Sequence, residues 1–375
     1  MIYFDNAATT LPSSSALCDA EKFNKEFYFN PSALYRGGLK NAAEIKAARE
    51  YILRSVGASL TDYELMFTSC GSESDNCAVF GAVKRGVFVT SKGEHAAIFR
   101  SFNELKNRNI KTEFIDLNTD GTIDEQKLFD YVSENKTDFV SIVHVNNETG
   151  GINDINAISE RLKKINPALI FHSDGVQAYG KIPYRLGKSV DLYSISAHKI
   201  NGLKGVGALI KRRKTNLSPL IFGGGQENGL RSGTENIFGI KVFEYAAREK
   251  FENLDKTFDK VNKINKYIRE HIDKNLFYII SSESASPFIL TVSAKGLKGE
   301  ILMHALEERD IVVGNGSACS SKKRFSRVIE ACGYKAEILD GVIRLSFTGA
   351  NTMDEAEIFV KIFNDECLKL KRIIR

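Results

Sequence analysis

The sequence predicts an α/β fold, with a mainly parallel sheet in a large domain and a smaller α+β domain after it. From about residue 40 to residue 210, short β-branched or aromatic runs alternate with helical patterns. This order of elements builds a parallel sheet covered by helices. A long helical pattern over 241–272 then leads to a second mixture of strands and helices. We therefore expect a large domain at 14–245 and a small domain made of 1–13 and 246–375.

Local patterns place the elements of the large domain. A helix is expected over 39–56, because Gly57 follows its end as a stop signal. The strand-like runs are YELMFTS (63–69), VFVTS (87–91), TEFIDL (112–117), FVSIVHV (139–145), LIFHSD (169–174), LYSISAH (192–198) and GALI (207–210). Further helices are expected over 72–84, 96–108, 124–133 and 154–165.

The small domain shows the same mixture of signals. One helix is expected over 241–272, followed by strands PFILTVSA (287–294) and VIRLSF (342–347) and a helix over 299–310. A tail helix follows Thr352, and Thr352 with Glu355 fits a capping box.

Composition excludes several classes of protein. No apolar run approaches the roughly 20 residues that span a bilayer, and the N-terminus lacks the pattern of a signal peptide. We therefore expect a cytoplasmic protein without membrane contact. The short basic pieces at 211–214, 322–324 and 369–372 are not interleaved with aromatic residues. They are expected on solvated faces, and no direct nucleic-acid binding is expected. The six cysteines form no CxxC pair, which argues against a zinc site.

Polar residues follow the predicted strands, at the sheet edge where ligands bind in such folds. These residues are Ser69, His95, Asn147, Asp174, His198 and Lys199. Lys199 stands in SISAHKINGLKGVG, between an apolar run and a glycine-rich loop. Desolvation and nearby positive charge favour the neutral amine that attacks carbonyls. A surface lysine is the alternative interpretation.

Other motifs each have two interpretations. Gly71 and Ser72 in TSCGSESDN suit either a phosphate at a helix start or simple capping. Asp174 could pair with a pyridinium nitrogen or cap a turn. Asn146 and Asn147 in HVNNETGG could equally serve a turn.

The remaining motifs also allow more than one interpretation. His95 suits a helix start, or stacking on an aromatic ring with proton transfer. Cys319 lies among small polar residues in VVGNGSACSS, which favours an exposed, reactive thiol in a loop. Arg344, within a predicted strand, suits a substrate carboxylate or a structural ion pair. The glycine-rich loop GGGQENGLRSGTEN contains Arg231 and Thr234 but no Walker-type motif.

Together the motifs resemble those of the cysteine desulfurases, class V aminotransferases that use pyridoxal 5′-phosphate (PLP). The resemblance runs from FDNAATT to VIRLSF and includes, in order, NPSALYRGG, TSCGSESDN, GEHAAI, VHVNNETGG, HSDGVQAYGK, SAHK, GGGQENGLRSGTEN and NGSACSS. It implies the fold-type I architecture of PLP transferases. The implied cofactor-binding residues are Gly71, Ser72, His95, Asn147, Asp174, Gln177, Ser196, His198, Lys199 and Thr234.

The resemblance also implies a role for each residue around the ring. Lys199 would be in Schiff-base linkage to PLP, and Asp174 would pair with the pyridinium nitrogen. Gln177 would hydrogen-bond the ring hydroxyl, and His95 would stack on the ring and take part in catalysis. The phosphate would be held by Gly71, Ser72, Ser196 and His198, and by Thr234 of a neighbouring subunit, which implies a homodimer.

The implied reaction converts L-cysteine to L-alanine and leaves the sulfur on Cys319 as a persulfide. Asn147 and Arg344 would orient the substrate carboxylate. The sulfur would pass to an acceptor protein, an iron–sulfur scaffold or a tRNA-thiolation enzyme, for cluster assembly or for thiolation of tRNA or cofactors. No metal is expected in the resting enzyme, and whether Cys319 transiently ligates an iron–sulfur cluster is left open.

Two rivals to this interpretation remain. One is a selenocysteine lyase or another class V enzyme such as a transaminase, and the other is an inactive sulfur-relay scaffold. The chain also departs from the family pattern. TSCGS, with Cys70, stands where TSGAT is commoner, and HSDGVQ stands where HVDATQ is more typical. The basic segment SSKKRFSR after Cys319 suggests an acidic partner.

Overall fold

The computed structural model describes residues 1–82, 86–315 and 325–374. Its larger sheet has the strand order β2-β8-β7-β6-β5-β3-β4. The strands are β2 (Tyr63–Thr68), β3 (Val87–Ser91), β4 (Lys111–Ile115), β5 (Thr137–Ser141), β6 (Ile170–Asp174), β7 (Leu192–Ser196) and β8 (Gly207–Arg212). Within this sheet, β8 alone runs opposite to the other strands, so the predicted mainly parallel sheet is confirmed.

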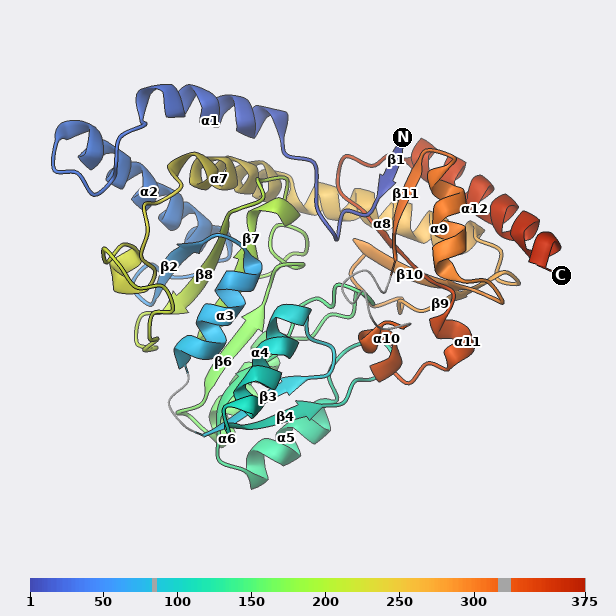
Figure 1. Ribbon diagram of the computed structural model, residues 1–375, viewed down its shortest axis with the longest axis horizontal. Helices are drawn as coiled ribbons and strands as arrows, with labels where there is room; N and C mark the ends of the chain where they lie inside the picture. The colour runs from blue at the N-terminus through green and yellow to red at the C-terminus, as the bar shows by residue number, and fades with distance from the viewer. Residues whose placement is uncertain (83–85, 316–324, 375) are drawn as a thin grey trace.

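Helices cover both faces of this sheet (Figure 1). Phe88 on β3 packs against Phe102 of α4 on one face, while the next residue, Val89, belongs to the core on the other face. Alternate residues of a strand point to opposite faces, which explains the apolar runs without polar alternation. The helices are α2 (Arg36–Ser55), α3 (Gly71–Ala82), α4 (Ala96–Asn107), α5 (Glu125–Glu134), α6 (Ile155–Ile165) and α7 (Ile237–Glu252). Helix α1 (Ser14–Glu26) packs on α7.

A second sheet, with strand order β1-β11-β12-β10-β9, contains the first and the last described strands of the chain. Its strands are β1 (Ile2–Phe4), β9 (Phe277–Ile279), β10 (Ile289–Ala294), β11 (Ile311–Asn315) and β12 (Val342–Ser346). Its helices are α8 (Leu254–His271), α9 (Gly299–Glu307), α10 (Arg327–Ala331), α11 (Ala336–Leu339) and α12 (Met353–Ile374). Phe4 of β1 lies in the core of this second unit with Phe359 of α12. The first strand of the chain is therefore part of the unit formed by its last third (Figure 1).

Two expectations about the elements are wrong. The single helix expected over 241–272 is two helices, α7 and α8, which meet at Asn253. The Asn253 carboxamide donates to the Glu249 carbonyl, a local bond of the kind that competes with helix continuation. The residues Val312–Asn315, expected in a loop, form most of β11 because they pair with β1 and β12. The capping box is confirmed: the Glu355 amide donates to Thr352 Oγ1 at 3.2 Å and the Thr352 amide to Glu355 Oε2 at 3.0 Å.

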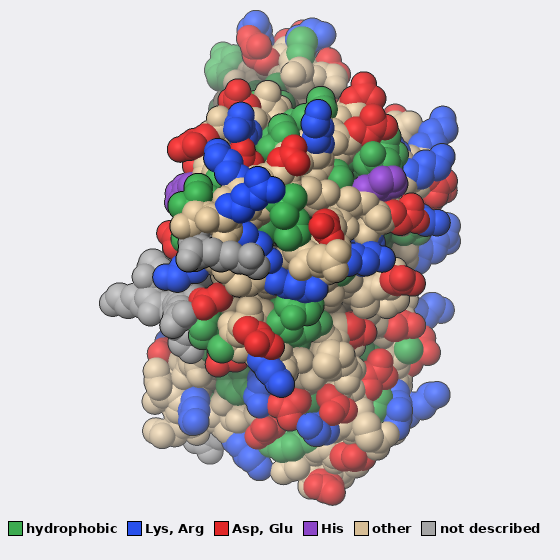
Figure 2. Space-filling view, turned by 90° about the vertical axis from the view of Figure 1, so that its right-hand side faces the viewer, with side chains coloured by type: hydrophobic (Ala, Val, Ile, Leu, Met, Phe, Trp, Pro, Cys, Tyr) green, Lys and Arg blue, Asp and Glu red, His purple; other side chains and the backbone are tan. Residues whose placement is uncertain are grey.

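The basic pieces do not all lie on solvated faces. Lys211 is buried, and its amine pairs with Glu64 at 2.7 Å. Arg213 and Lys214 are exposed, and 322–324 lies outside the described residues. Figure 2 shows basic and acidic side chains interspersed on the visible face, with no continuous basic surface there. Among the described residues, no helix is long and apolar enough to cross a membrane.

Candidate active site

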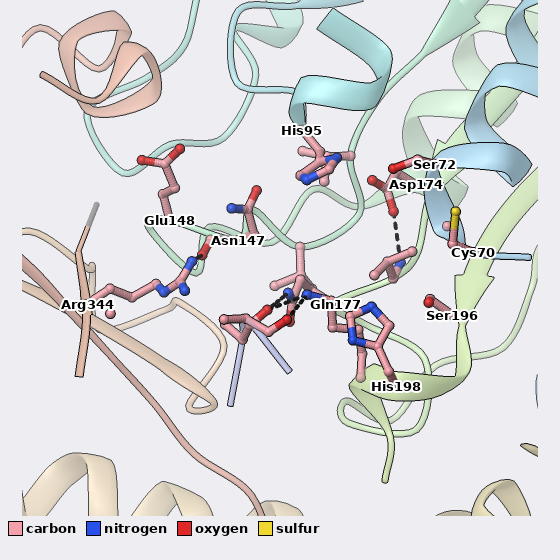
Figure 3. A pocket seen from close by; sticks show the side chains of 18 of the residues that line it. Cys70, Ser72, His95, Asn147, Glu148, Asp174, Gln177, Ser196, His198 and Arg344 are labelled. Carbon is pink, nitrogen blue, oxygen red and sulfur yellow. Dashed lines mark hydrogen bonds between the residues drawn. The ribbon is translucent and has the colours of Figure 1, made fainter. Parts of the chain in front are cut away.

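A cavity of about 350 Å³ lies where the carboxyl ends of β6 and β7 face the N-terminal segment and the second sheet (Figure 3). Most of the expected site residues line it. They are Gly71, Ser72, His95, Asn147, Asp174, Gln177, Ser196, His198, Lys199 and Arg344. Residues far apart in the sequence thus converge on one cavity, at the sheet edge that the strand pattern indicated.

Lys199 ends the short 3₁₀ turn η1 (Ala197–Lys199) that follows β7. Its amine donates to the carbonyls of Ala7 at 2.6 Å and Ala8 at 2.8 Å. The preceding His198 bonds to Thr9 Oγ1 at 3.2 Å. Burial, followed by the charge of Lys199, lowers the pKa of His198 to about 4. The N-terminal segment therefore holds the lysine beside a neutral imidazole.

Asp174 lies at the end of β6 and is buried. Burial raises the pKa of its carboxyl, whereas His95 and Lys199 lower it. Asp75, His95 and Asp174 each place one ligand atom within 4.8 Å of the others. Asp75 Oδ1 is buried and has no hydrogen-bond partner among the described residues. Two carboxyls and an imidazole suit a cation, either a protonated ring nitrogen or a metal ion, so the expected absence of a metal stays a prediction.

His95 serves as the N-cap of α4, which confirms the helix-start interpretation, and it also lines the cavity. Stacking on a ring and proton transfer stay predictions. Its Nδ1 accepts from the Ala97 amide at 3.2 Å. The neutral ring therefore carries its proton on Nε2. Burial lowers the pKa of His95, and Lys199 and Arg327 add to the lowering while Asp174 opposes it.

The amino end of α3 forms another wall of the cavity. Helix α3 begins at Gly71, where a β-carbon would lie 2.9 Å from Val176 Cγ2. Ser196 Oγ, at the end of β7, is buried without a hydrogen-bond partner among the described residues. Free amides at a helix start and an unpaired hydroxyl suit a phosphate.

Arg344 forms a structural ion pair, one of the two roles that were open for it, and its role toward a substrate carboxylate stays a prediction. Its Nη2 pairs with Asp5 Oδ1 at 2.7 Å, and its Nη1 donates to the Asn147 carbonyl at 3.0 Å. Its Nε and Asn147 Oδ1 are buried and lack hydrogen-bond partners within the described part of the chain. A ligand carboxylate in the cavity would meet a donor that the protein itself leaves unsatisfied.

The two asparagines of HVNNETGG separate into two roles. Asn146 Oδ1 accepts from the amides of Glu148 and Thr149, both at 2.9 Å, which is turn chemistry. Asn147 lines the cavity. Sequence spacing alone could not distinguish them.

One expected residue, Thr234, does not line this cavity, and another, Cys319, is not described. Thr234 lines a different, smaller cavity of about 120 Å³ beside Arg231. Its expected contact would come from a second subunit and stays a prediction. Cys319 lies outside the described residues.

Several residues at or beside the cavity were not singled out from the sequence: Asp5, Asp75, Glu148 and Lys181. Asp5 and Glu148 belong to the motifs FDNAATT and NNETG, which carried the resemblance without a role for either carboxylate. Glu148 accepts a hydrogen bond from Ser326, the N-cap of α10. Lys181 in QAYGK had no sequence signal, because a lysine after glycine reads as a surface residue.

The fold is that of the class V aminotransferases, and the chain belongs to that family, which it matches over residues 2–359. The family consists of PLP enzymes. The chain is 37% identical over 377 residues to the NifS/IcsS protein homolog of Lactobacillus delbrueckii subsp. bulgaricus, covering 97% of each chain. It is 33% identical to cysteine desulfurase IscS of Dictyoglomus turgidum, covering 99% of this chain and 96% of the relative. A solved NifS-like protein superposes with a TM-score of 0.90 at 31% identity, covering 97% and 98% of the two chains.

Proposed function

We propose that this protein is a cysteine desulfurase that binds PLP in the cavity of Lys199. The observation that carries the proposal is the convergence of Lys199, Asp174 and His95 on one cavity, beside the start of α3. The unpartnered Ser196 hydroxyl and Asp75 carboxylate oxygen are the features that a phosphate and a cationic ring would satisfy. The names of the relatives support cysteine as the substrate.

The residues present fit the cofactor. Lys199 supplies the amine that would bond its aldehyde, Asp174 the anion for its ring nitrogen, and His95 an imidazole for its ring face. Gly71, Ser72, Ser196 and His198 would hold its phosphate. When bound, PLP supplies an electron sink for the bonds of the substrate α-carbon, which requires the ring nitrogen to stay protonated.

The chain's own groups bind the substrate and move its protons. Arg344 and Asn147 would orient the carboxylate of cysteine, with the Arg344 Nε that the fold leaves unpaired. Lys199 would take and return protons at carbon, because its amine lies in the cavity, held by the Ala7 and Ala8 carbonyls.

The sulfur of the substrate cysteine would be transferred to Cys319. The Cβ–S bond of cysteine breaks, an S–S bond forms at the Cys319 thiol, and the substrate carbon takes up a proton to give L-alanine. The thiol becomes a persulfide, so the transfer needs no external oxidant or reductant. An acceptor protein would then take the sulfur for iron–sulfur cluster assembly or thiolation, and its identity stays a prediction, as does the cytoplasmic location.

A homodimer is part of this proposal. Thr234 lies away from the cavity of its own chain, as a residue serving a neighbouring subunit would. Large apolar side chains are exposed near the N-terminal helices and in the loop before Thr234. They include Leu34, 89% exposed, and Phe222, 81% exposed. Apolar side chains exposed to this degree favour contact with another protein surface.

The test is Cys319→Ser in the full chain. Sulfide release from cysteine should be abolished, while the visible absorbance of bound PLP should be unchanged. Retained release would instead favour a lyase that does not need the thiol, and a transaminase would not need Cys319 at all. A colourless protein that takes up no PLP would point to an inactive scaffold.

A further inference from the structure

Lys181 is a buried lysine to which the proposed mechanism gives no role. It is 4% exposed, and among the described residues its amine bonds to the Gln177 carboxamide and forms no ion pair with a carboxylate. Burial lowers its pKa well below the usual range, and Lys199, Lys250 and Arg344 add to the lowering. Burying a lysine without a carboxylate costs stability. Its presence is therefore better explained by a function than by folding.

The amine of Lys181 has a defined partner. Its Nζ donates to Gln177 Oε1 at 2.7 Å. On the other side of the carboxamide, Gln177 Nε2 donates to the Ala7 carbonyl at 2.9 Å. A backbone carbonyl only accepts hydrogen bonds, so the nitrogen of Gln177 must face Ala7. The oxygen must then face Lys181, which donates whether or not its amine is charged.

This arrangement continues to the catalytic lysine. The Ala7 carbonyl accepts from both Gln177 Nε2 and Lys199 Nζ, the latter at 2.6 Å. Gln177 lines the cavity (Figure 3). Its Nε2 carries two hydrogens and uses one on Ala7, so one N–H remains for a ligand. With the carboxamide reversed, a carbonyl oxygen would face the ligand instead.

We infer that Lys181 is a positioning residue: together with the Ala7 carbonyl, it holds the Gln177 carboxamide in the orientation that offers an N–H to an acceptor oxygen on the cofactor ring. This inference rests on the proposed function, because the ring oxygen belongs to PLP. The N–H stabilises that oxygen as an anion. If this N–H donor is lost, the anionic form of the ring oxygen is less stable, so the oxygen binds a proton more tightly.

The test compares Lys181→Met with the unmodified chain and with Lys250→Met. Lys250 is a matched control, since burial also lowers its pKa and no hydrogen bond joins it to Gln177 within the described residues. Lys181→Met should weaken PLP binding to the cofactor-free chain roughly three- to tenfold. The pH midpoint of the visible absorbance of bound PLP should rise by roughly half a unit. Lys250→Met should change neither.

A stability measurement separates positioning from a structural role. Without cofactor, Lys181→Met should unfold in urea at the same or a higher concentration than the unmodified chain, because methionine fills the buried site without a polar head. A lower midpoint would assign Lys181 a structural role and overturn the inference.

A double-mutant cycle with Gln177→Leu completes the test. In that background, Lys181→Met should alter neither PLP affinity nor the pH midpoint, since no carboxamide remains to be oriented. The inference fails if the same changes persist there, or if Lys181→Met alone binds PLP as the unmodified chain does. An unmodified chain that takes up no PLP would overturn the proposed function itself, and the inference with it.

Discussion

Gly175, directly after Asp174, leaves no room for a side chain. A β-carbon there would lie 1.9 Å from Cζ and 2.3 Å from Oη of Tyr193. Ordinary contacts begin at 3.4 Å, so one group would have to move by about 1.5 Å. Tyr193 is fully buried and its hydroxyl is bonded to His144 Nδ1 at 2.9 Å, so its ring has no free space to enter.

Gly175→Ala should therefore lower the free energy of unfolding by about 3 kcal/mol, the upper part of the range for overpacking. The loss of chain entropy in the unfolded state would act in the opposite sense by only about 0.4–1 kcal/mol. The shift should also displace Asp174 and weaken PLP binding. Urea unfolding followed by circular dichroism measures the first effect, and absorbance titration of the cofactor-free chain measures the second.

The same steric reasoning predicts that the stability effects of substitutions at Gly175 and Tyr193 are strongly coupled. Tyr193→Ala alone should cost about 3–5 kcal/mol, because it leaves a cavity. In that background Gly175→Ala should add less than about 1 kcal/mol, since the ring is gone. Tyr193→Phe should give no such relief, because Cζ remains. Additive costs, or a Gly175→Ala chain as stable as its parent, would refute the steric account of this glycine.

Three further outcomes test the electrostatics. Asp174→Asn removes the buried anion at constant shape, so cysteine turnover should fall about 100-fold and PLP binding should weaken; unchanged turnover would contradict this role. Arg344→Lys keeps the positive charge but loses the paired N–H donors of the guanidinium, so the KM for cysteine in steady-state assays should rise about tenfold. The absorbance spectrum of bound PLP should stay unchanged. Burial lowers the pKa of His144 and His172 from 6.5 to about 3, so the stability they contribute is present above pH 6.5 and is lost as pH falls towards 3, by about 1.4 kcal/mol per pH unit each. Burial raises the pKa of Glu94 to about 8, so its contribution to stability changes in the opposite direction between pH 4.5 and pH 8. His172→Asn should therefore flatten the decline in urea-unfolding stability most clearly below about pH 4.5. An unchanged slope of stability against pH would contradict this.

The succession of strands and helices along the chain, and the convergence of Lys199 with Asp174, could be predicted because both are local signals. Each residue follows an apolar run, and the ends of neighbouring parallel strands meet at one edge. The pairing of β1 with β11 could not be predicted in this way, since Ile2 and Ile311 are distant in sequence and three residues carry no periodicity.

Other features depend on contacts that no short motif encodes. The space beside Gly175 is filled by Tyr193 from the next strand. The orientation of Gln177 depends on Lys181 and on a carbonyl of the N-terminal segment. Thr234 lines a separate, smaller cavity, and its proposed contact with a second subunit stays a prediction. Sequence therefore identified the residues that line the cavity better than the contacts that hold them in position.

The central claim is that the amine of Lys199 carries the cofactor. Borohydride reduction of the PLP-loaded chain, followed by peptide mass mapping, tests it directly. We expect a single pyridoxyl adduct on Lys199 and none on the buried Lys181. An unmodified Lys199, or an adduct on Lys181, would contradict the account.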